Sequence, residues 1–512
     1  MKNFIIKIMN NRSLGEYLKN IIPFNVIKRP FLLLCAIYSI AITAIVRANV
    51  NYVDDLGRTA RGYRGWENFG RYLSNYLSTL IHASKDLTDI SPLPQLITVI
   101  LISLASVIII YLFSNKHKIS FWSTVAAIPI GLSPYFLECF SYKFDSPYMA
   151  LSILASVTPA LFFEEHVLVY SLSIAIGTLI MSMTYQASSG IFALVILFLL
   201  AVKWNEGTPL KKLFNKAMVS FSGYIVAMII FYIWIAPHGD TYVSRDISPY
   251  NMFIQTIQSN ILRYFKLLKE DYQHSWKVLA IILCFSFVIT FIHKSQRNKI
   301  LSAIVAFILI VVGSVLSFGA YTCLPKPSFA PRAMYGFGVY IALIGIIAVN
   351  NCKITGYLPK ITAFCLAWCL FAFTFTYGNA LAEQKRYADF RIQMVLNDLT
   401  RVIKLQTNDK KNKYEVQLDG NIGFSPIVNR MLKKHKPLGR LVKVTFGGGW
   451  TWSRQYFFNY FSLPNVVAVD SKGDISKKYK RDFTKEDLKT LYDCNYHTIK
   501  AADKKILIML KH

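Results

Sequence analysis

Long apolar blocks without charged residues recur along this 512-residue chain. Each block is roughly 17–22 residues long, which is the length that a helix needs to cross the hydrocarbon core of a bilayer. The chain therefore reads as an α-helical polytopic membrane protein. We expect about eleven transmembrane helices, which lie near residues 31–50, 95–113, 119–137, 147–163, 167–185, 189–203, 217–236, 276–293, 299–319, 333–350 and 360–378. The first block is too long for a cleaved signal peptide and is expected to stay as a signal anchor.

Basic residues gather in loops that fall on one side of the membrane if each block crosses once. They lie before the first span, after the second, between the sixth and seventh, and between the eighth and ninth: Lys28, Arg29, Lys116, Lys118, Lys203, Lys211, Lys212, Lys216, Lys294, Arg297 and Lys299. The positive-inside bias makes this side cytoplasmic. The opposite side, which carries the loops 138–147, 237–275 and 320–332, is then periplasmic. This layout indicates a multi-pass membrane protein.

The composition changes near residue 379, where the apolar blocks end. We divide the chain into a cytoplasmic segment 1–30, a transmembrane catalytic domain 31–378 with a first periplasmic loop 51–94, and a periplasmic α/β domain 379–512. In this last domain we expect strands at 414–418, 441–446, 466–469 and 505–510, and helices at 427–434, 454–461 and 485–491. The tail is basic, and the whole chain carries a formal charge of +29. An outward location argues against nucleic acid as the partner, so anionic lipid head groups or glycan are favoured.

Two adjacent carboxylates, Asp54 and Asp55, follow the first span. One simple interpretation is a solvated pair, or an ion pair with Arg58 or Arg61. The alternative is catalysis, in which one carboxylate removes a proton from a sugar hydroxyl that attacks an anomeric carbon. A partly desolvated pair of like charges raises the proton affinity that such a base needs. The other carboxylate would orient the hydroxyl or hold a divalent cation, and no other cofactor is indicated.

A glycosyl donor outside the cytoplasm has to be lipid-linked, because nucleotide sugars are not supplied there. Its phosphate needs cations, and arginine offers a forked donor. The candidates are Arg58, Arg61, Arg64, Arg71, Arg245, Lys326 and Arg332. Arg332 is preferred because three prolines, Pro325, Pro327 and Pro331, stiffen its loop. In the second outward loop, Glu138, Lys143 and Asp145 stand among aromatic residues, a mixture that suits a sugar but also an ordinary interfacial turn.

Residues 66–82 place apolar side chains at a helical period, which predicts a short helix in the interface plane. Together with Tyr52–Arg58, and with Gly70 and Arg71, this segment resembles the first periplasmic loop of the bacterial Gtr glucosyltransferases, the phage-associated enzymes that modify lipopolysaccharide O-antigen. The resemblance implies a GT-C-like glycosyltransferase of the bacterial inner membrane that takes glucose from undecaprenyl phosphate and inverts the anomeric centre during transfer to O-antigen. It also implies that Asp54 and Asp55 are the acidic pair of that family, one of them the base.

Three other functions fit the same pattern. A related GT-C enzyme would use a different lipid-phosphate sugar. A polysaccharide flippase or other transporter would place polar groups near the membrane midplane, whereas here the ionisable groups crowd one face. A non-catalytic assembly subunit would use only the basic tail.

Overall fold

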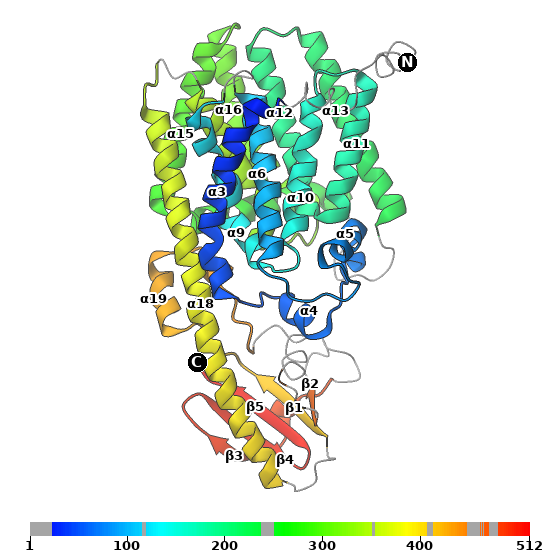
Figure 1. The fold of residues 1–512 in the computed structure, drawn as a ribbon, viewed down its shortest axis with the longest axis vertical. Helices are drawn as coiled ribbons and strands as arrows, with labels where there is room; N and C mark the ends of the chain where they lie inside the picture. Colours follow the sequence, from blue (N-terminus) through cyan, green and yellow to red (C-terminus); the bar gives the residue numbers. More distant parts are fainter. Residues whose placement is uncertain are drawn as a thin grey trace.

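A computed structural model describes residues 23–114, 119–236, 250–350, 354–406, 413–447, 461, 463, 465–469 and 480–512. Long helices form a bundle, and one of them continues out of the bundle to a small β-sheet near the C-terminus (Figure 1). The first described helix, at residues 24–48, begins at the opposite end of the bundle from the sheet. The predicted organisation, a helical membrane domain followed by a small domain with a sheet, is confirmed.

All eleven apolar blocks contain helices. These are α3 (Phe24–Ala48), α6 (Leu93–Phe113), α7 to α9 (Phe121–Ala127, Pro129–Leu132 and Pro134–Ser141), α10 with η2 (Ser146–Val157 and Thr158–Phe162), α11 (Val167–Thr184), α12 (Ser189–Asn205), α13 (Leu210–Ile230), α15 (His274–Lys294), α16 (Lys299–Leu316), α17 (Gly336–Val349) and α18 (Leu358–Gln406). In the described residues eight helices are long and apolar enough to cross a membrane, and the pair Phe121–Leu132 and Pro134–Ser141, bent by 57°, is a ninth candidate. The helices at 146–162 and 336–349 are shorter, so the full count of eleven crossings stays a prediction.

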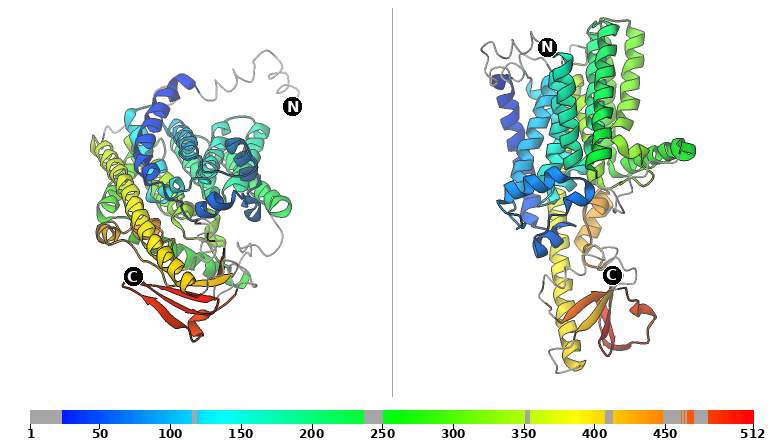
Figure 2. Two further views of the ribbon diagram at one scale, coloured as in Figure 1. Left: turned by 60° about the horizontal axis from the view of Figure 1, so that its bottom comes forward. Right: turned by 90° about the vertical axis from the view of Figure 1, so that its right-hand side faces the viewer.

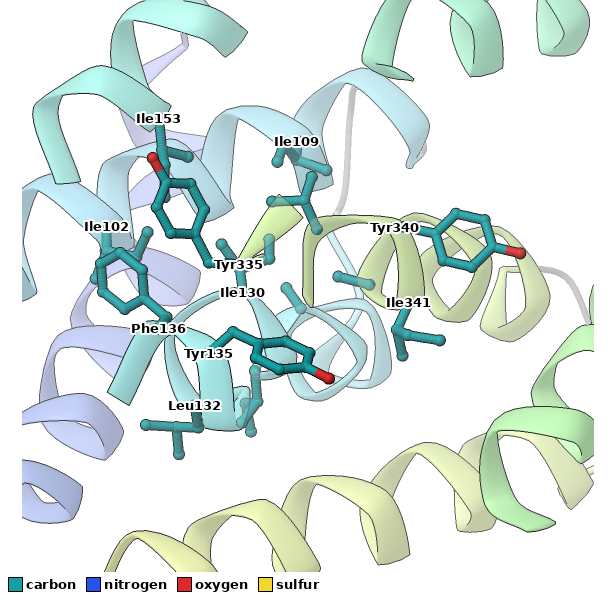
Figure 3. Close-up of a cluster of buried hydrophobic side chains, with 14 of the residues drawn as sticks. Ile102, Ile109, Ile130, Leu132, Tyr135, Phe136, Ile153, Tyr335, Tyr340 and Ile341 are labelled. Atoms are coloured by element: carbon teal, nitrogen blue, oxygen red, sulfur yellow. The ribbon is translucent and has the colours of Figure 1, made fainter. Parts of the chain in front are cut away.

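The interior of the bundle is built around α17, which is buried along nearly its whole length. Figure 3 shows Ile102 of α6, Phe136 of α9, Ile153 of α10 and Tyr335 among the side chains that pack there. In a membrane, lipid tails are as apolar as these side chains, so close packing and not removal from water holds the helices together.

Shorter elements connect the helices. They are α4 (Asp55–Arg61), η1 (Trp66–Phe69), α5 (Tyr72–His82), η3 (Gln186–Ser188), η4 (Phe231–Ile235), η5 (Tyr250–Met252), α14 (Phe253–Asp271), η6 (Gly319–Cys323) and η7 (Pro331–Ala333). The predicted helix over residues 66–82 is wrong as a single element. It divides at Gly70, whose φ of 71° only glycine adopts readily. The second piece, α5, runs across the end of the bundle (Figures 1 and 2).

Helix α18 is the longest element, with 49 residues. The predicted domain boundary at 378 falls inside it, so the bundle and the C-terminal sheet share one continuous helix. A Cβ on Gly378 would lie 2.5–2.7 Å from Ala44 and Ile45 of α3. Gly378 therefore marks a close helix crossing and not a helix end.

The sheet has five strands in the order β2-β1-β5-β4-β3. They are β1 (Tyr414–Asp419), β2 (Val466–Val469), β3 (Lys489–Asp493), β4 (His497–Ala502) and β5 (Lys505–Leu510). β1 pairs in parallel with both β2 and β5, and β4 pairs in antiparallel with β3 and β5. One face packs on Val395, Leu399 and Val402 of α18.

The predictions for this region are partly right. The strands at 414–418, 466–469 and 505–510 are confirmed, and the helix at 427–434 is found as α19 (Pro426–Lys434). The strand predicted at 441–446 is wrong, since a short helix, α20 (Leu438–Leu441), precedes an irregular stretch there. The helix predicted at 485–491 is also wrong, because η9 (Phe483–Lys485) leads into β3. The helix predicted at 454–461 lies almost entirely outside the described residues.

In the described part of the connection from β1 to β2, Ile422 and Phe446 pack in the core of the sheet, whereas the middle of the connection does not. Val428 of α19 and Leu438, Leu441 and Val442 around α20 belong instead to the buried core of the helical bundle. We call residues 426–443 the docked crossover. It carries part of the C-terminal region into the end of the bundle, beside α18 (Figure 1).

Candidate active site

The predicted acidic pair lies at the end of the bundle that faces the C-terminal sheet, where the chain leaves α3 and enters α4 (Figure 1). Val53, directly before the pair, has a φ of 50°. A β-branched residue pays a steric cost for this left-handed backbone. Such strain persists only where the surrounding structure enforces it, and it is common at functional sites.

Asp54 is the accessible member of the pair. It is partly exposed, and no hydrogen bond to its carboxylate comes from the described residues; its backbone carbonyl accepts from the Arg58 N–H at 3.1 Å. Desolvation raises the pKa of Asp54, and the charges of Arg58, Arg332 and Arg71 partly offset this while Asp145 adds to it. Asp54 is thus a carboxylate with raised proton affinity among three guanidinium groups.

Asp55 is fully buried. Its Oδ2 accepts hydrogen bonds from the backbone N–H groups of Tyr52 at 3.1 Å and Lys143 at 3.0 Å. Its Oδ1 is buried without a partner. Desolvation raises the pKa of Asp55 well above its usual range. The side chain therefore ties the loop after α3 to the loop after α9, and this contact distinguishes the two acids.

Asp145 connects Arg58 and Trp66 in a buried polar contact. Its carboxylate forms an ion pair with Arg58 and accepts a hydrogen bond from Nε1 of Trp66. The Arg58 guanidinium also lies 4.3 Å from the centre of the Trp66 ring, a cation–π distance. All three side chains are buried. The structure therefore brings the predicted residues Arg58 and Asp145 together, and the two form an ion pair with each other.

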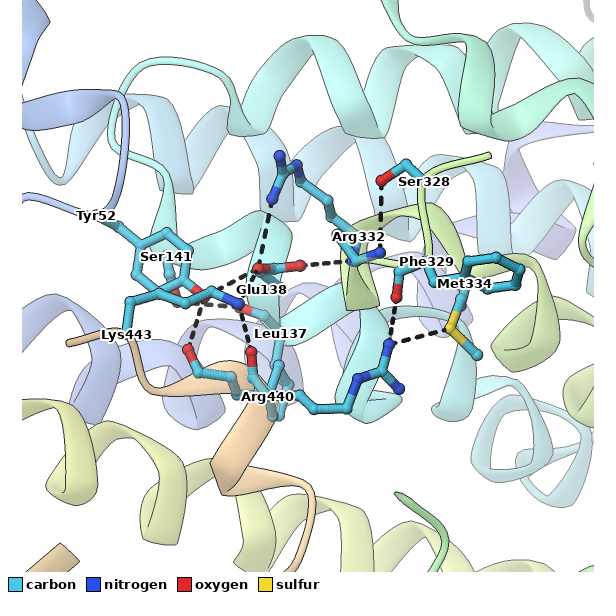
Figure 4. A network of polar contacts seen from close by, with 12 residues as sticks. Tyr52, Leu137, Glu138, Ser141, Ser328, Phe329, Arg332, Met334, Arg440 and Lys443 are labelled. Carbon is cyan, nitrogen blue, oxygen red and sulfur yellow. Dashed lines mark hydrogen bonds and ion pairs between the residues drawn. The ribbon is translucent and has the colours of Figure 1, made fainter. Parts of the chain in front are cut away.

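Glu138 is the centre of a second network, which Figure 4 shows. Its fully buried carboxylate lies 3.5 Å from Arg332 Nη1 and 3.1 Å from Lys443 Nζ. Oε2 accepts from the Arg332 backbone N–H at 2.6 Å, and Oε1 lies 3.0 Å from the Tyr52 hydroxyl, whose single proton is also within reach of the Leu441 carbonyl. Because a buried charge is costly without such partners, Glu138 fixes the position of Arg332. The Arg332 side chain remains 26% exposed, and its positive charge lowers the pKa of Asp54.

The remaining predicted cations differ in their surroundings. Lys143 Nζ contacts Asn49, Asn51 and Asp89 at 2.6–3.0 Å, so its three protons are taken up within the protein and none is left for the predicted contact with substrate. Arg71 Nε donates to Gln186 at 3.0 Å, and its guanidinium lies 4.4 Å from the Tyr185 ring centre. Lys326 is exposed, and no contact within the described chain joins it to this cluster. Arg245 lies outside the described residues.

A cation held by the acidic pair would need further ligands. Among the described residues, the only group of three or more His, Cys, Asp or Glu side chains close enough to share an ion is Asp398, Cys494 and His497, in the C-terminal region. Asp54 and Asp55 therefore remain a pair, without a third such ligand among those residues.

The sequence analysis missed Tyr52, Trp66, Arg440 and Lys443. The last two come from the docked crossover, more than a hundred residues beyond the other site residues. Arg440 forms an ion pair with Asp271 and donates to the Phe329 carbonyl. The only local signal was two cations three residues apart within the apolar stretch Leu438–Val444, which places them on one face of a helical turn.

The helical bundle is that of a polytopic membrane protein, and a cluster of charged side chains lies at one end of it. Comparison with known proteins then identifies the family: the profile described as glucosyl transferase GtrII matches residues 43–343. The chain belongs to this family, and the resemblance seen in the first loop is confirmed. A glycosyltransferase needs a sugar donor and a glycan acceptor.

The matched region contains both acids, Glu138, Asp145 and Arg332, and ends before α18. A protein of Salmonella phage P22, described as an uncharacterized 55.3 kDa protein in the gtrB 5′ region, is 23% identical over 445 residues, which cover 84% of this chain and 90% of that protein. No solved structure matches the chain.

Proposed function

We propose that this protein transfers glucose from undecaprenyl phosphate to lipopolysaccharide O-antigen on the periplasmic side of the bacterial inner membrane, with inversion at the anomeric carbon. The observation that carries the proposal is the partly exposed carboxylate of Asp54, whose pKa is raised by desolvation and is lowered in part by the charges of Arg58, Arg332 and Arg71. This arrangement would combine a base and phosphate-binding cations at one end of the membrane bundle.

In this reaction Asp54 accepts the proton of an acceptor hydroxyl as that oxygen attacks the anomeric carbon of glucose. The bond from this carbon to the phosphate oxygen breaks on the opposite face, and the lipid phosphate leaves with the electron pair. Proton transfer by a placed base contributes typically about 10²–10⁴-fold to a rate, most effectively when its pKa lies near the working pH. Asp55 holds the loop that positions Asp54.

The leaving phosphate needs a cation that substrate can reach. Arg332 suits this role because Glu138 anchors its backbone while part of its side chain stays exposed. Arg71 is the second candidate, since its hydrogen bond to Gln186 uses only Nε and its guanidinium stacks on Tyr185. Arg58 is buried against Asp145 and Trp66. We therefore assign to it the positioning of these two side chains and the lowering of the pKa of Asp54.

The orientation is supported by charge. The first turns of α3 contain Lys28 and Arg29, and this end of α3 lies opposite to α4 and the sheet (Figure 1). A basic end is the cytoplasmic one. Alkaline phosphatase fused after His512 should then be active and β-galactosidase at the same place inactive. The reverse pattern would exclude a periplasmic site.

The direct test of function is glycan analysis of lipopolysaccharide from cells with and without the gene, joined to transfer assays on membranes with defined lipid-phosphate sugars. We expect one added glucose per modified repeat unit, dependent on undecaprenyl-phosphate glucose. Transfer from a mannosyl or aminoarabinosyl donor instead would keep the enzyme class but replace the sugar.

A further inference from the structure

A cavity of about 150 Å³ lies between the loop that carries the acidic pair, helix α18 and the stretch after the docked crossover. Its first wall contains Tyr52 and Leu56, which flank Asp54 by two residues on either side. The cavity thus borders the loop that carries the proposed base, although Asp54 itself is not among its lining residues.

The second wall is one face of α18. Its lining residues recur every three or four positions over three turns: Leu381, Gln384, Lys385, Ala388, Asp389 and Ile392. Five of the nine residues from 383 to 391 of α18 are charged: Glu383, Lys385, Arg386, Asp389 and Arg391. A helix of that composition lies outside the hydrocarbon core, so the cavity faces an aqueous ligand and not the lipid chain of a donor.

The third wall is Lys443, Thr445, Phe446 and Gly447. Lys443 reaches from this wall to Glu138, which anchors Arg332. The cavity therefore touches both the base loop and the network behind the phosphate-binding arginine.

We propose that this cavity is the acceptor subsite and that it holds a saccharide of the O-antigen, an inference that rests on the proposed function. Sugars present apolar C–H faces and many hydroxyl groups. The walls match both: Tyr52 and Phe446 offer aromatic surface, while Asn51, Thr445 and the Lys385–Asp389 ion pair at 2.8 Å offer hydrogen-bonding groups. Pockets of this kind, mainly apolar with a few placed polar groups, are typical of small-ligand sites.

Under this assignment, the helical bundle and the C-terminal region have different roles in the reaction. The bundle supplies the base and the phosphate-binding arginines, and α18 with residues 443–447 recognises the glycan. Acceptor choice then depends on a region that lies beyond the family match at 43–343.

The test uses the full-length protein in liposomes, with undecaprenyl-phosphate glucose as donor and the repeat-unit oligosaccharide released from host O-antigen as acceptor. Ala388→Trp fills the cavity, and Asp389→Ala removes a polar group from its partly exposed rim. Arg386→Trp is the matched control, because Arg386 lies on α18 with a side chain 76% exposed and outside the cavity.

We expect Ala388→Trp to raise the KM for oligosaccharide by about tenfold or more through steric exclusion, and Asp389→Ala to raise it by about threefold through loss of one polar contact. The KM for donor should stay unchanged in both, and Arg386→Trp should match the wild type. An unchanged acceptor KM in both cavity variants, or a rise in donor KM alone, would overturn the assignment.

Binding of the same oligosaccharide, measured by saturation-transfer NMR on the full-length protein, separates this inference from the proposed function. If the wild type transfers no glucose but binds oligosaccharide in a manner that Ala388→Trp abolishes, the function is wrong and the cavity assignment stands. If the wild type transfers glucose and Ala388→Trp binds normally, the cavity assignment is wrong and the function stands.

Discussion

The ammonium group of Lys443 lies 3.1 Å from the fully buried carboxylate of Glu138, and so joins the docked crossover to the broken span α7–α9. Three further contacts hold the crossover in place. Arg440 pairs with Asp271, the Tyr52 hydroxyl donates to the Leu441 carbonyl at 2.6 Å, and Gln273 bonds His435 at 2.7 Å. The C-terminal region is therefore built into the active end of the bundle.

Removal of the Lys443 charge should destabilise the protein. Lys443→Met leaves Glu138 with one fewer cation in a buried position, and we expect a loss of about 2 kcal/mol in the free energy of unfolding. Thermal unfolding in detergent measures it. Lys511→Met is the control, because its pair with Asp493 is largely exposed and such pairs contribute about 0–1 kcal/mol. Equal melting temperatures for both variants would show that Lys443 does not stabilise Glu138.

The contact of Asp145 with Arg58 and Trp66 leads to a graded prediction. Asp145→Ala leaves a buried guanidinium unpaired, which costs about 3–5 kcal/mol, so little folded protein should reach the membrane. Trp66→Phe removes only one hydrogen bond, which costs about 1 kcal/mol, and retains the ring beneath Arg58. Yields of correctly inserted protein should rank wild type, Trp66→Phe and Asp145→Ala in that order, and a reversed order of the two variants would contradict the contact.

The pH profile should report on Asp54. Its pKa is raised from 3.8 by desolvation, and the base acts only when ionised, so transfer should fall as pH drops through that raised pKa. The Arg332 charge lowers the same pKa. Arg332→Gln should therefore shift the acid limb of kcat/KM to higher pH, besides weakening donor binding.

Arg332→Lys keeps a cation and should shift the limb less. Arg401→Gln, at an exposed position on α18, should leave the limb in place. An acid limb that stays fixed, or that moves to lower pH in Arg332→Gln, would separate Arg332 from the base.

The membrane helices follow from hydropathy because each one needs only its own composition to be recognised. The same rule set the predicted domain boundary at 378, where an apolar window ends while helix α18 continues. Beyond Gly378, α18 is continued by helix-forming charged residues with pairs such as Lys385–Asp389, spaced four apart. The sequence marks where the membrane span ends, but a soluble extension of the helix carries no boundary signal there.

The sequence could indicate which candidate residues lie together when they are close in the chain. It could not do so when tertiary contacts bring distant residues together. Asp54, Asp55 and Arg58 lie in one short segment, so their proximity was readable. Which acid is accessible depends on the Lys143 backbone, which turns Asp55 inward. Lys443 reaches Glu138 only through the docked crossover, whose placement depends on the buried core it shares with the bundle.

We assign Asp54 as the base and Asp55 as a structural residue. The direct measurement is glucose transfer from undecaprenyl-phosphate glucose to O-antigen oligosaccharide by purified wild type, Asp54→Asn and Asp55→Asn in liposomes. Asp54→Asn should lose about 10²–10⁴-fold in rate with normal insertion. Asp55→Asn should stay active, because its amide oxygen can accept the same two backbone hydrogen bonds. Wild-type rates for Asp54→Asn would contradict the account.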